Sequence, residues 1–307
     1  MLLPDHYVIL DDRFKKLIHK NAWPDTLWTG AKWCEGPAYF PASRTLIWSD
    51  IINDRVMRWD EASGQVTTFE QPCGCHNGHA IDAEGRLISC EHRTRSVTRT
   101  EHDGTRAILA SHFEGKRLNS PNDVVVKSDG SIWFTDPTYG IDSHYEGDKA
   151  DSEIGAANVY RIDPDGSMTC VVDDMVRPNG LAFSPDESLL YVADTGQSHD
   201  PDCSPKLRVY PVMDKQLGAG RLFCECTYGV FDGFRVDRSG HIWSSSGEGI
   251  HCIHPDGTLL GKILLPEVIS NVQFGGPKRN RLFATGRSAL YAIYVNAQGI
   301  LATDHSG

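Results

Sequence analysis

The sequence lacks long apolar runs and clusters of positive charge. No apolar stretch in the 307 residues is long enough for a membrane-spanning helix. The 30 Lys and Arg residues are scattered among 41 Asp and Glu residues, which gives a net charge of −11. No patch suited to a nucleic-acid backbone is therefore visible. An acidic balance favours solubility and attracts cations, so we expect a soluble protein with no nucleic-acid and no membrane partner.

The start of the chain and the cysteines both indicate a reducing, cytoplasmic compartment. Residues 1–10 have neither the basic start nor the continuous apolar core of a secretory signal. The nine cysteines are odd in number and scattered, with two C-x-C pairs but no C-x-x-C and no Cys/His spacing typical of zinc sites. We expect free, largely buried thiols rather than disulfides.

Helical periodicity and familiar catalytic motifs are nearly absent. The chain has no H-E-x-x-H, G-x-S-x-G, Walker A or G-x-G-x-x-G motif. The exception to the lack of helical pattern is Asp11 to Lys20, where Phe14, Leu17 and Ile18 could share one helical face. We expect this segment to form a short capping helix ahead of the main fold.

An internal repeat dominates the rest of the chain. Each copy has a polar residue, a short apolar strand, a Gly/Asp/Ser turn and a second strand that ends in a polar residue. Copies recur at roughly the 40 to 55 residues typical of propeller blades. The six copies begin at Glu35, Asn77, Asn122, Asn179, Asp232 and Asn271.

A further pair of strands follows the repeat unit, joined by Asp-Gly or Pro-Asp-Gly turns that favour hairpins. Four antiparallel strands in six repeats predict an all-β, six-bladed β-propeller. Residues 1–30 would form the N-terminal cap, and residues 31–307 a single propeller domain. Thr26–Thr29 and the tail at 299–303 are candidates for the strands that close the ring, because closure removes exposed sheet edges.

Two long insertions interrupt the repeat, at residues 139–158 and 196–207. Loops of this length in a compact domain are commonly lids or binding loops. For the second insertion, a tolerated surface loop is an equally open alternative.

The six repeat-starting residues should meet near the propeller axis, because the first strand of each blade lines the central channel. All six are polar, and Asn or Asp at a strand start can simply satisfy the backbone. Glu35 does not suit a turn, however, and two carboxylates in a narrow channel repel each other. A cation would relieve this repulsion. Glu35 and Asp232 would supply charge, with neutral oxygens from Asn179 and Asn122, a hard-oxygen set that suits Ca²⁺ and less selectively Mg²⁺ or Mn²⁺.

Carboxylates also end several second strands, and a serine run ends another. We interpret these groups as hydrogen-bonding supports between blades, with a catalytic role as the minority alternative. They are Asp50, Glu91, Asp136, Asp194 and the segment 244–247.

Several motifs together resemble the gluconolactonase/regucalcin-like (senescence-marker-protein) family of six-bladed propellers, and in particular bacterial-type sugar lactonases. The resemblance runs from about Trp33 to the last blade. The motifs are "EGPAYF", "NSPNDVVVKSDGSIWFTDPTYG", "PNGLAFSPDESLLYVADTG" and "FDGFRVDRSGHIWSS".

The resemblance implies one divalent metal ion held by Glu35, Asn179 and Asp232, with Asn122 near the substrate. Asn77 is similar to a further channel asparagine of bacterial members. Ca²⁺ is the favoured ion, with Zn²⁺, Mn²⁺ or Mg²⁺ as alternatives. The chain reads D-P-T-Y-G where many bacterial members of the family have D-P-P-Y-G. Animal members have a substrate-contacting arginine at a place near Ser120, and this chain has no counterpart of it. The preferred lactone therefore stays open.

These features predict a metal-dependent hydrolase that opens sugar lactones such as gluconolactone to the aldonic acid. Asp232 would take a proton from the attacking water, Asn122 and Asn77 would orient the sugar ring, and Tyr139 would form part of the pocket wall. Two alternatives are a related metal-dependent arylesterase or phosphotriesterase, and a non-catalytic propeller that binds calcium or another ligand. We expect a monomer or weak homodimer.

Overall fold

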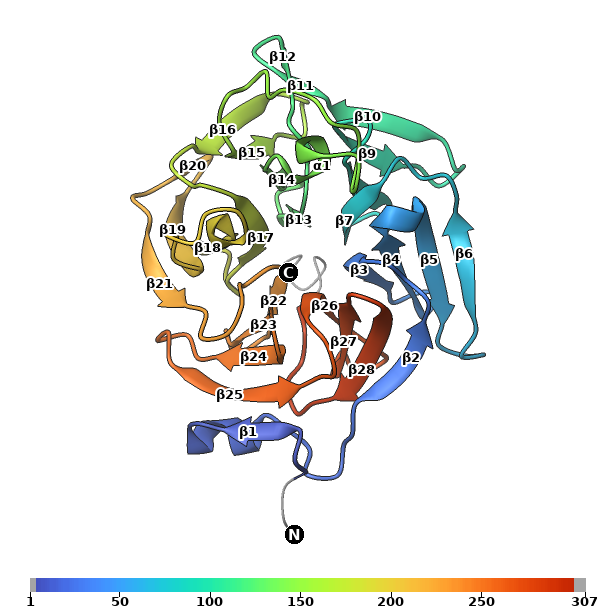
Figure 1. Cartoon of the computed structure of the whole chain (residues 1–307), viewed down its shortest axis with the longest axis vertical. Coiled ribbons are helices and arrows are strands. Elements are labelled where there is room, and N and C mark those ends of the chain that lie inside the picture. Colours follow the sequence, from blue (N-terminus) through green and yellow to red (C-terminus); the bar gives the residue numbers. More distant parts are fainter. Residues whose placement is uncertain (1–3, 301–307) are drawn as a thin grey trace.

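The computed structural model describes residues 4–300, which form a six-bladed propeller around a central channel (Figure 1). Each blade is an antiparallel sheet whose first strand is innermost, as the repeat predicted. The first three blades contain, from the channel outward, β3 (Cys34–Phe40), β4 (Thr45–Asp50), β5 (Arg55–Asp60) and β6 (Val66–Glu70); β7 (His76–Ile81), β8 (Leu87–Glu91), β9 (Ser96–Thr100) and β10 (Arg106–Ala110); β13 (Val124–Val126), β14 (Ile132–Asp136), β15 (Asn158–Ile162) and β16 (Met168–Val172).

The fourth and fifth blades have five strands each, and the sixth reaches four strands with one from the N-terminal region. The fourth carries two strands, β20 and β21, beside β19, the fifth gains β1 from the N-terminus, and the sixth gains β2. Their strands are β17 (Pro178–Phe183), β18 (Leu189–Asp194), β19 (Lys206–Met213), β20 (Gln216–Leu217) and β21 (Arg221–Glu225); β22 (Phe234–Val236), β23 (Ile242–Ser246), β24 (Gly249–Ile253), β25 (Leu259–Leu264) and β1 (Tyr7–Ile9); β26 (Ile269–Gly275), β27 (Arg281–Gly286), β28 (Ala289–Tyr294) and β2 (Asp25–Thr29). A small hairpin, β11 (His112–Phe113) and β12 (Lys116–Arg117), lies beyond β10.

The core lies between the blades. Six clusters of buried apolar side chains each join two neighbouring blades, so alternate residues of the strands pack against the adjacent sheet. Trp133 and Trp243 occupy equivalent positions in β14 and β23 and are fully buried. Face-to-face packing all around the ring fixes the height at which the inner strands meet the axis.

The ring is closed by β2, which pairs with β28 in antiparallel register. This confirms the ring-closing strand expected at Thr26–Thr29. The other candidate, the chain tail, makes a single bridge between Gly299 and Asp237 of the fifth blade, while residues 301–303 lie outside the described part of the chain. The pairing of β1 with β25 was not expected from the sequence.

The capping helix predicted for Asp11 to Lys20 was wrong in type and length. The chain forms a five-residue 3₁₀ helix, η1 (Asp12–Lys16), because it enters a bridge between Ile18 and Val295 soon afterwards. The apolar face was correct: Phe14 is fully buried against Trp243, with Ile18 in the same cluster.

Two further features concern the cysteines and the helices. All nine cysteines are free, and five of them are buried. Among residues 4–300, no helix has the length and apolarity needed to cross a membrane.

Candidate active site

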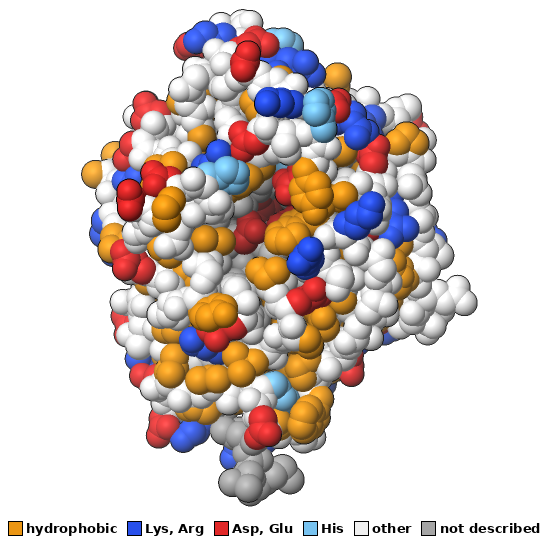
Figure 2. All heavy atoms as spheres, viewed as in Figure 1, with side chains coloured by type: hydrophobic (Ala, Val, Ile, Leu, Met, Phe, Trp, Pro, Cys, Tyr) orange, Lys and Arg blue, Asp and Glu red, His pale blue; other side chains and the backbone are white. Residues whose placement is uncertain are grey.

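A pocket of about 180 Å³ opens at the centre of one face of the propeller. Figure 2 shows acidic side chains at the bottom of this hollow, with hydrophobic side chains around its rim. The structure places five of the six repeat-starting residues in its lining, together with Tyr139. These five are Glu35, Asn77, Asn122, Asn179 and Asp232.

The sixth residue, Asn271, is buried but does not line the pocket. Its Nδ2 donates to Glu35 Oε2 at 3.3 Å, and its Oδ1 accepts from the Val272 amide at 2.9 Å. Asn271 therefore supports the Glu35 carboxylate from behind.

A glycine follows four of the site residues, and the structure gives the reason. A Cβ atom on Gly36 would lie 2.0 Å from the carbonyl oxygen of Asn77, and one on Gly180 would lie 2.2 Å from that of Asp232. The Gly180 amide instead donates to this Asp232 oxygen at 3.0 Å. The missing side chain thus lets the inner strands of adjacent blades touch, which holds the neighbouring site residues at one height.

The two carboxylates at the base of the pocket are deeply buried and repel each other. Burial, with the charge of Asp123, raises the pKa of Glu35 to about 8. Burial, followed by the charge of Glu35, raises the pKa of Asp232 well above its usual range. Both raised pKa values mean that ionising these carboxyl groups costs free energy when no cation is bound. A cation between these groups would remove the penalty.

The chemistry of the donor set fits a hard cation. Asn179 lines the same pocket as Glu35 and Asp232, so its side-chain amide could supply a neutral oxygen beside the two carboxylates. Among residues 4–300, no group of three or more His, Cys, Asp or Glu side chains is arranged to hold a metal. Two carboxylates and an amide are consistent with that finding, and they are the ligand types that Ca²⁺ prefers.

The two insertions meet over the pocket at Tyr139, the first residue of α1 (Tyr139–Asp142). Its hydroxyl oxygen lies 2.7 Å from Thr195 Oγ1 and 2.8 Å from Ser198 Oγ, and the Arg177 guanidinium lies 4.9 Å from its ring centre. Ser198 belongs to a short 3₁₀ helix, η3 (Gly196–Ser198). Tyr139 therefore forms the wall and joins both insertions, while its contact with a substrate stays a prediction.

Sequence reasoning missed Glu146, which lines the pocket from the first insertion. Burial, with the charge of Asp142, raises the pKa of Glu146 to about 7. A loop outside the repeat has no register, so the only available signal was the expectation that the insertion is a lid.

Sequence reasoning also missed an ion pair across the channel. Asp123 stands where four other repeats have glycine, and it is buried. Its Oδ2 lies 3.6 Å from Arg235 Nη1 on β22. Burial raises the pKa of Asp123, opposed by the charge of Arg235. The replacement of glycine by aspartate in one repeat was the available signal.

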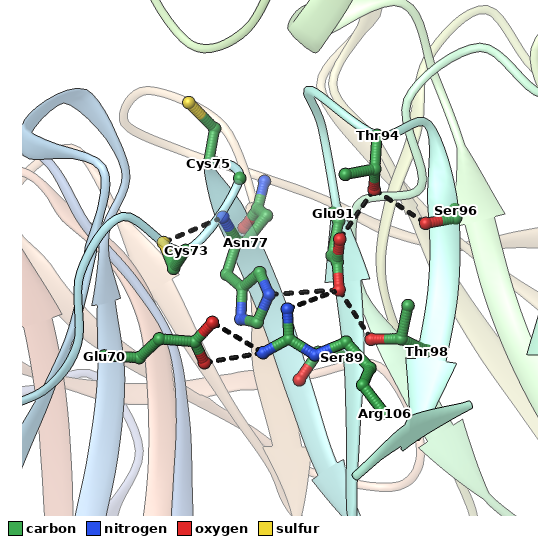
Figure 3. Close-up of polar contacts among 12 residues, drawn as sticks. Glu70, Cys73, Cys75, Asn77, Ser89, Glu91, Thr94, Ser96, Thr98 and Arg106 are labelled. Atoms are coloured by element: carbon green, nitrogen blue, oxygen red, sulfur yellow. Dashed lines mark hydrogen bonds and ion pairs between the residues drawn. The ribbon is translucent and has the colours of Figure 1, made fainter. Parts of the chain in front are cut away.

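The carboxylates that end the second strands support the blades and do not line the pocket. In Figure 3, Glu91 lies between Thr94, Thr98 and Arg106, with its oxygens 2.6 Å, 2.7 Å and 3.4 Å from their donor atoms. Asp136 accepts two main-chain N–H bonds that position the loop before β13.

The serine run at the end of β23 is likewise structural. Its three serines are fully buried and do not line the pocket. Ser245 Oγ accepts from the Asp232 amide at 3.0 Å. The run thus fixes the backbone of a site residue and offers no accessible nucleophile.

Comparison with known families agrees with this arrangement. A family model described as the SMP-30/Gluconolactonase/LRE-like region matches residues 33–288. The chain belongs to this family. The match extends from the residue before β3 to the residue before β28, and so includes every site residue described above.

Individual relatives cover most of the chain. A gluconolactonase from Zymomonas mobilis is 30% identical over 76% of this chain and 69% of its own length. The pentonolactonase XacC of Haloferax volcanii is 30% identical over 84% of this chain and 82% of its own. The solved structure of a gluconolactonase from Xanthomonas campestris is 41% identical, has a TM-score of 0.88 and covers 94% of both chains.

Proposed function

We propose that the protein is a metal-dependent lactonase that hydrolyses sugar lactones of the gluconolactone type to aldonic acids. The observation that carries the proposal is the convergence of Glu35, Asn179 and Asp232 in one buried pocket of a chain that belongs to this family. These three residues would hold one divalent ion, with Ca²⁺ favoured by the oxygen donors. We place the enzyme in the cytoplasm, as a monomer or weak homodimer.

The bound ion would polarise the lactone carbonyl and make a nearby water more acidic. Asp232 takes the proton as the water oxygen bonds to the carbonyl carbon. The ring C–O bond then breaks, and the leaving oxygen takes up a proton to become the hydroxyl of the aldonic acid. Asn122 and Asn77 orient the hydroxyls of the ring from the base of the pocket.

The wall limits the space around the reacting ester. Tyr139 and Glu146 lie on the first insertion, and Ser198 lies on the second, so together they border the substrate on the side facing solvent. Side chains on this side of the pocket would keep the ring in place for the reaction.

The test combines metal removal with a substrate panel. The purified protein is treated with EDTA, then assayed on gluconolactone and other aldonolactones after addition of Ca²⁺, Zn²⁺, Mn²⁺ or Mg²⁺, with the spontaneous hydrolysis rate subtracted. We expect activity to disappear with EDTA and to return with at least one ion. An aryl ester and a phosphotriester serve as comparison substrates.

Each result has a definite meaning. Activity that is indifferent to EDTA in a protein free of metal by elemental analysis contradicts metal dependence. Preference for the aryl ester or phosphotriester assigns the pocket to esterase chemistry. Calcium binding without turnover of any ester assigns it to a binding propeller.

A further inference from the structure

The amide of Asn77 has one satisfied end and one unsatisfied end. Asn77 lies on β7, is 3% exposed and lines the pocket. Its Nδ2 lies 3.0 Å from His92 Nε2. Its Oδ1 is buried and has no hydrogen-bond partner among the described residues. An unpaired buried acceptor beside a pocket is costly unless a ligand completes it.

The partner of Asn77, His92, is itself held by the first insertion. His92 follows β8 and is fully buried. Its Nδ1 lies 3.2 Å from the main-chain oxygen of Glu146. Since a carbonyl oxygen can only accept, Nδ1 must carry the hydrogen.

The other nitrogen of His92 is then fixed as an acceptor. Burial lowers the pKa of His92 to about 4, so the ring is neutral near pH 7. A neutral ring with its hydrogen on Nδ1 has a lone pair on Nε2. Asn77 must therefore turn its NH₂ group to His92 and its carbonyl oxygen away.

We propose that His92 is a positioning residue that fixes the Asn77 amide with its oxygen towards the bound substrate, where it accepts a hydrogen bond from a ring hydroxyl. This inference rests on the proposed lactonase function and deepens it. It assigns Asn77 the recognition of a hydroxyl donor rather than of a ring oxygen or another acceptor.

The orientation of the amide is coupled to the wall of the pocket. Gly140 in α1 packs so closely on His92 that a Cβ atom there would lie 2.5 Å from His92 Cβ. The same insertion supplies the Glu146 carbonyl. The wall therefore sets the direction of a hydrogen bond at the base of the pocket, through one histidine ring.

A spectroscopic test does not depend on turnover. Long-range ¹⁵N–¹H spectra of the histidine side chains would be recorded on the full protein at neutral pH, with His92 assigned by its absence in His92→Phe. We expect a neutral ring protonated on Nδ1 and unprotonated on Nε2. A hydrogen on Nε2, or a doubly protonated ring, overturns the proposal whether or not the protein is a lactonase.

A kinetic test follows the consequence for recognition. Gluconolactone is compared with its monodeoxy analogues, because a site built around a substrate hydroxyl discriminates against the analogue that lacks it. We expect one analogue to be disfavoured by the wild type. His92→Phe should reduce that preference about tenfold or more, mainly through KM, because the amide is freed to turn. His92→Gln, which can present an acceptor to Asn77, should restore part of it.

Controls separate positioning from stability and from metal binding. His251→Phe removes another fully buried histidine, on β24, and should leave the preference unchanged. The Ca²⁺ affinity of His92→Phe, measured by calorimetry, should match the wild type. An unchanged preference in a folded His92→Phe, or a loss of Ca²⁺ affinity, overturns the proposal. If the wild type hydrolyses no lactone, the proposed function is wrong. The spectroscopic test of the His92 ring can still be made, because it needs no turnover.

Discussion

The base and the wall of the pocket are built by different parts of the chain. The base residues Glu35, Asn179 and Asp232 stand at or just before the starts of inner strands, which lie close to the neighbouring blades: the Gly180 amide donates to the Asp232 carbonyl oxygen, and Gly36 packs against the Asn77 carbonyl oxygen. The wall residues Tyr139, Glu146 and Ser198 belong to two insertions that connect the second and third strands of the third and fourth blades. The base depends on the whole ring, whereas the wall depends on loops that meet at a few side-chain contacts.

This difference in construction indicates that the base and the wall have different roles in function. The base gathers buried negative charge, which suits the metal and the reacting ester, and its geometry cannot change without shifting a blade. The wall can vary in sequence without disturbing the blades, as is usual for loops on a rigid scaffold. We therefore expect changes in the base to affect the chemical step and changes in the wall to affect substrate binding.

The largest effect is expected from Asp232→Asn in the base. The substitution keeps the shape of the side chain, but it removes the proposed proton acceptor and one negative charge at the metal. We expect kcat to fall by about 10²- to 10⁴-fold, with the fold retained by circular dichroism. Steady-state hydrolysis of gluconolactone measures the loss. Activity within tenfold of the wild type would show that the proton goes elsewhere.

The second effect concerns the stability of the metal-free protein. Burial raises the pKa of Glu35 from 4.5 in an ordinary glutamate to about 8. Between these values the folded chain keeps a proton that the unfolded chain has released, so the free energy of unfolding decreases as pH rises. The stabilisation is fully present below about pH 4.5 and is lost by about pH 8.

Thermal unfolding in EDTA from pH 5 to pH 8 measures this slope, and we expect Tm to fall across the range. Bound Ca²⁺ should make the fall smaller, because it stabilises the ionised carboxylates of the folded state. Glu35→Gln in EDTA should also reduce the slope, since the titrating group is gone. Equal slopes in all three samples would contradict a cation site at Glu35.

The base of the pocket was more predictable from the sequence than its wall. Glu35, Asn179 and Asp232 could be placed together because each occupies the same register of a repeat, and the repeat dictates the propeller. The register could not show that Asn271 turns back to bond Glu35, nor that Asp123 pairs with Arg235, because both depend on side-chain contacts across blades.

The wall and the N-terminus were less predictable because tertiary contacts determine their structure. Glu146 lies in a loop with no periodic pattern, so nothing in its sequence context relates it to the channel. The spacing of Phe14 and Ile18 correctly indicated a buried face, but the helix ends early where the chain bridges to Val295. Local propensity does not carry that information.

A moderate effect is expected from Glu146→Gln in the wall. Its carboxylate has a pKa of about 7, so its charge changes near neutral pH, but we assign the proton transfer to Asp232. We expect kcat/KM to fall by less than the roughly hundredfold lower limit for a lost general base. Glu153→Gln, an exposed carboxylate on the same insertion, is the control. A loss as large as that of Asp232→Asn would show that Glu146, and not Asp232, accepts the proton.

The smallest effect is expected from Tyr139→Phe, which keeps the ring in the wall and removes the hydroxyl that joins Thr195 and Ser198. Loss of these bonds should reduce the free energy of unfolding by about 1 kcal/mol and raise KM by a few-fold, with kcat nearly unchanged, because the two insertions would no longer be tied together. Tyr145→Phe changes an exposed tyrosine of the same insertion and should alter neither quantity. If kcat fell while KM stayed constant, Tyr139 would act in the chemical step. The wall would then contribute to the reaction as well as to substrate binding.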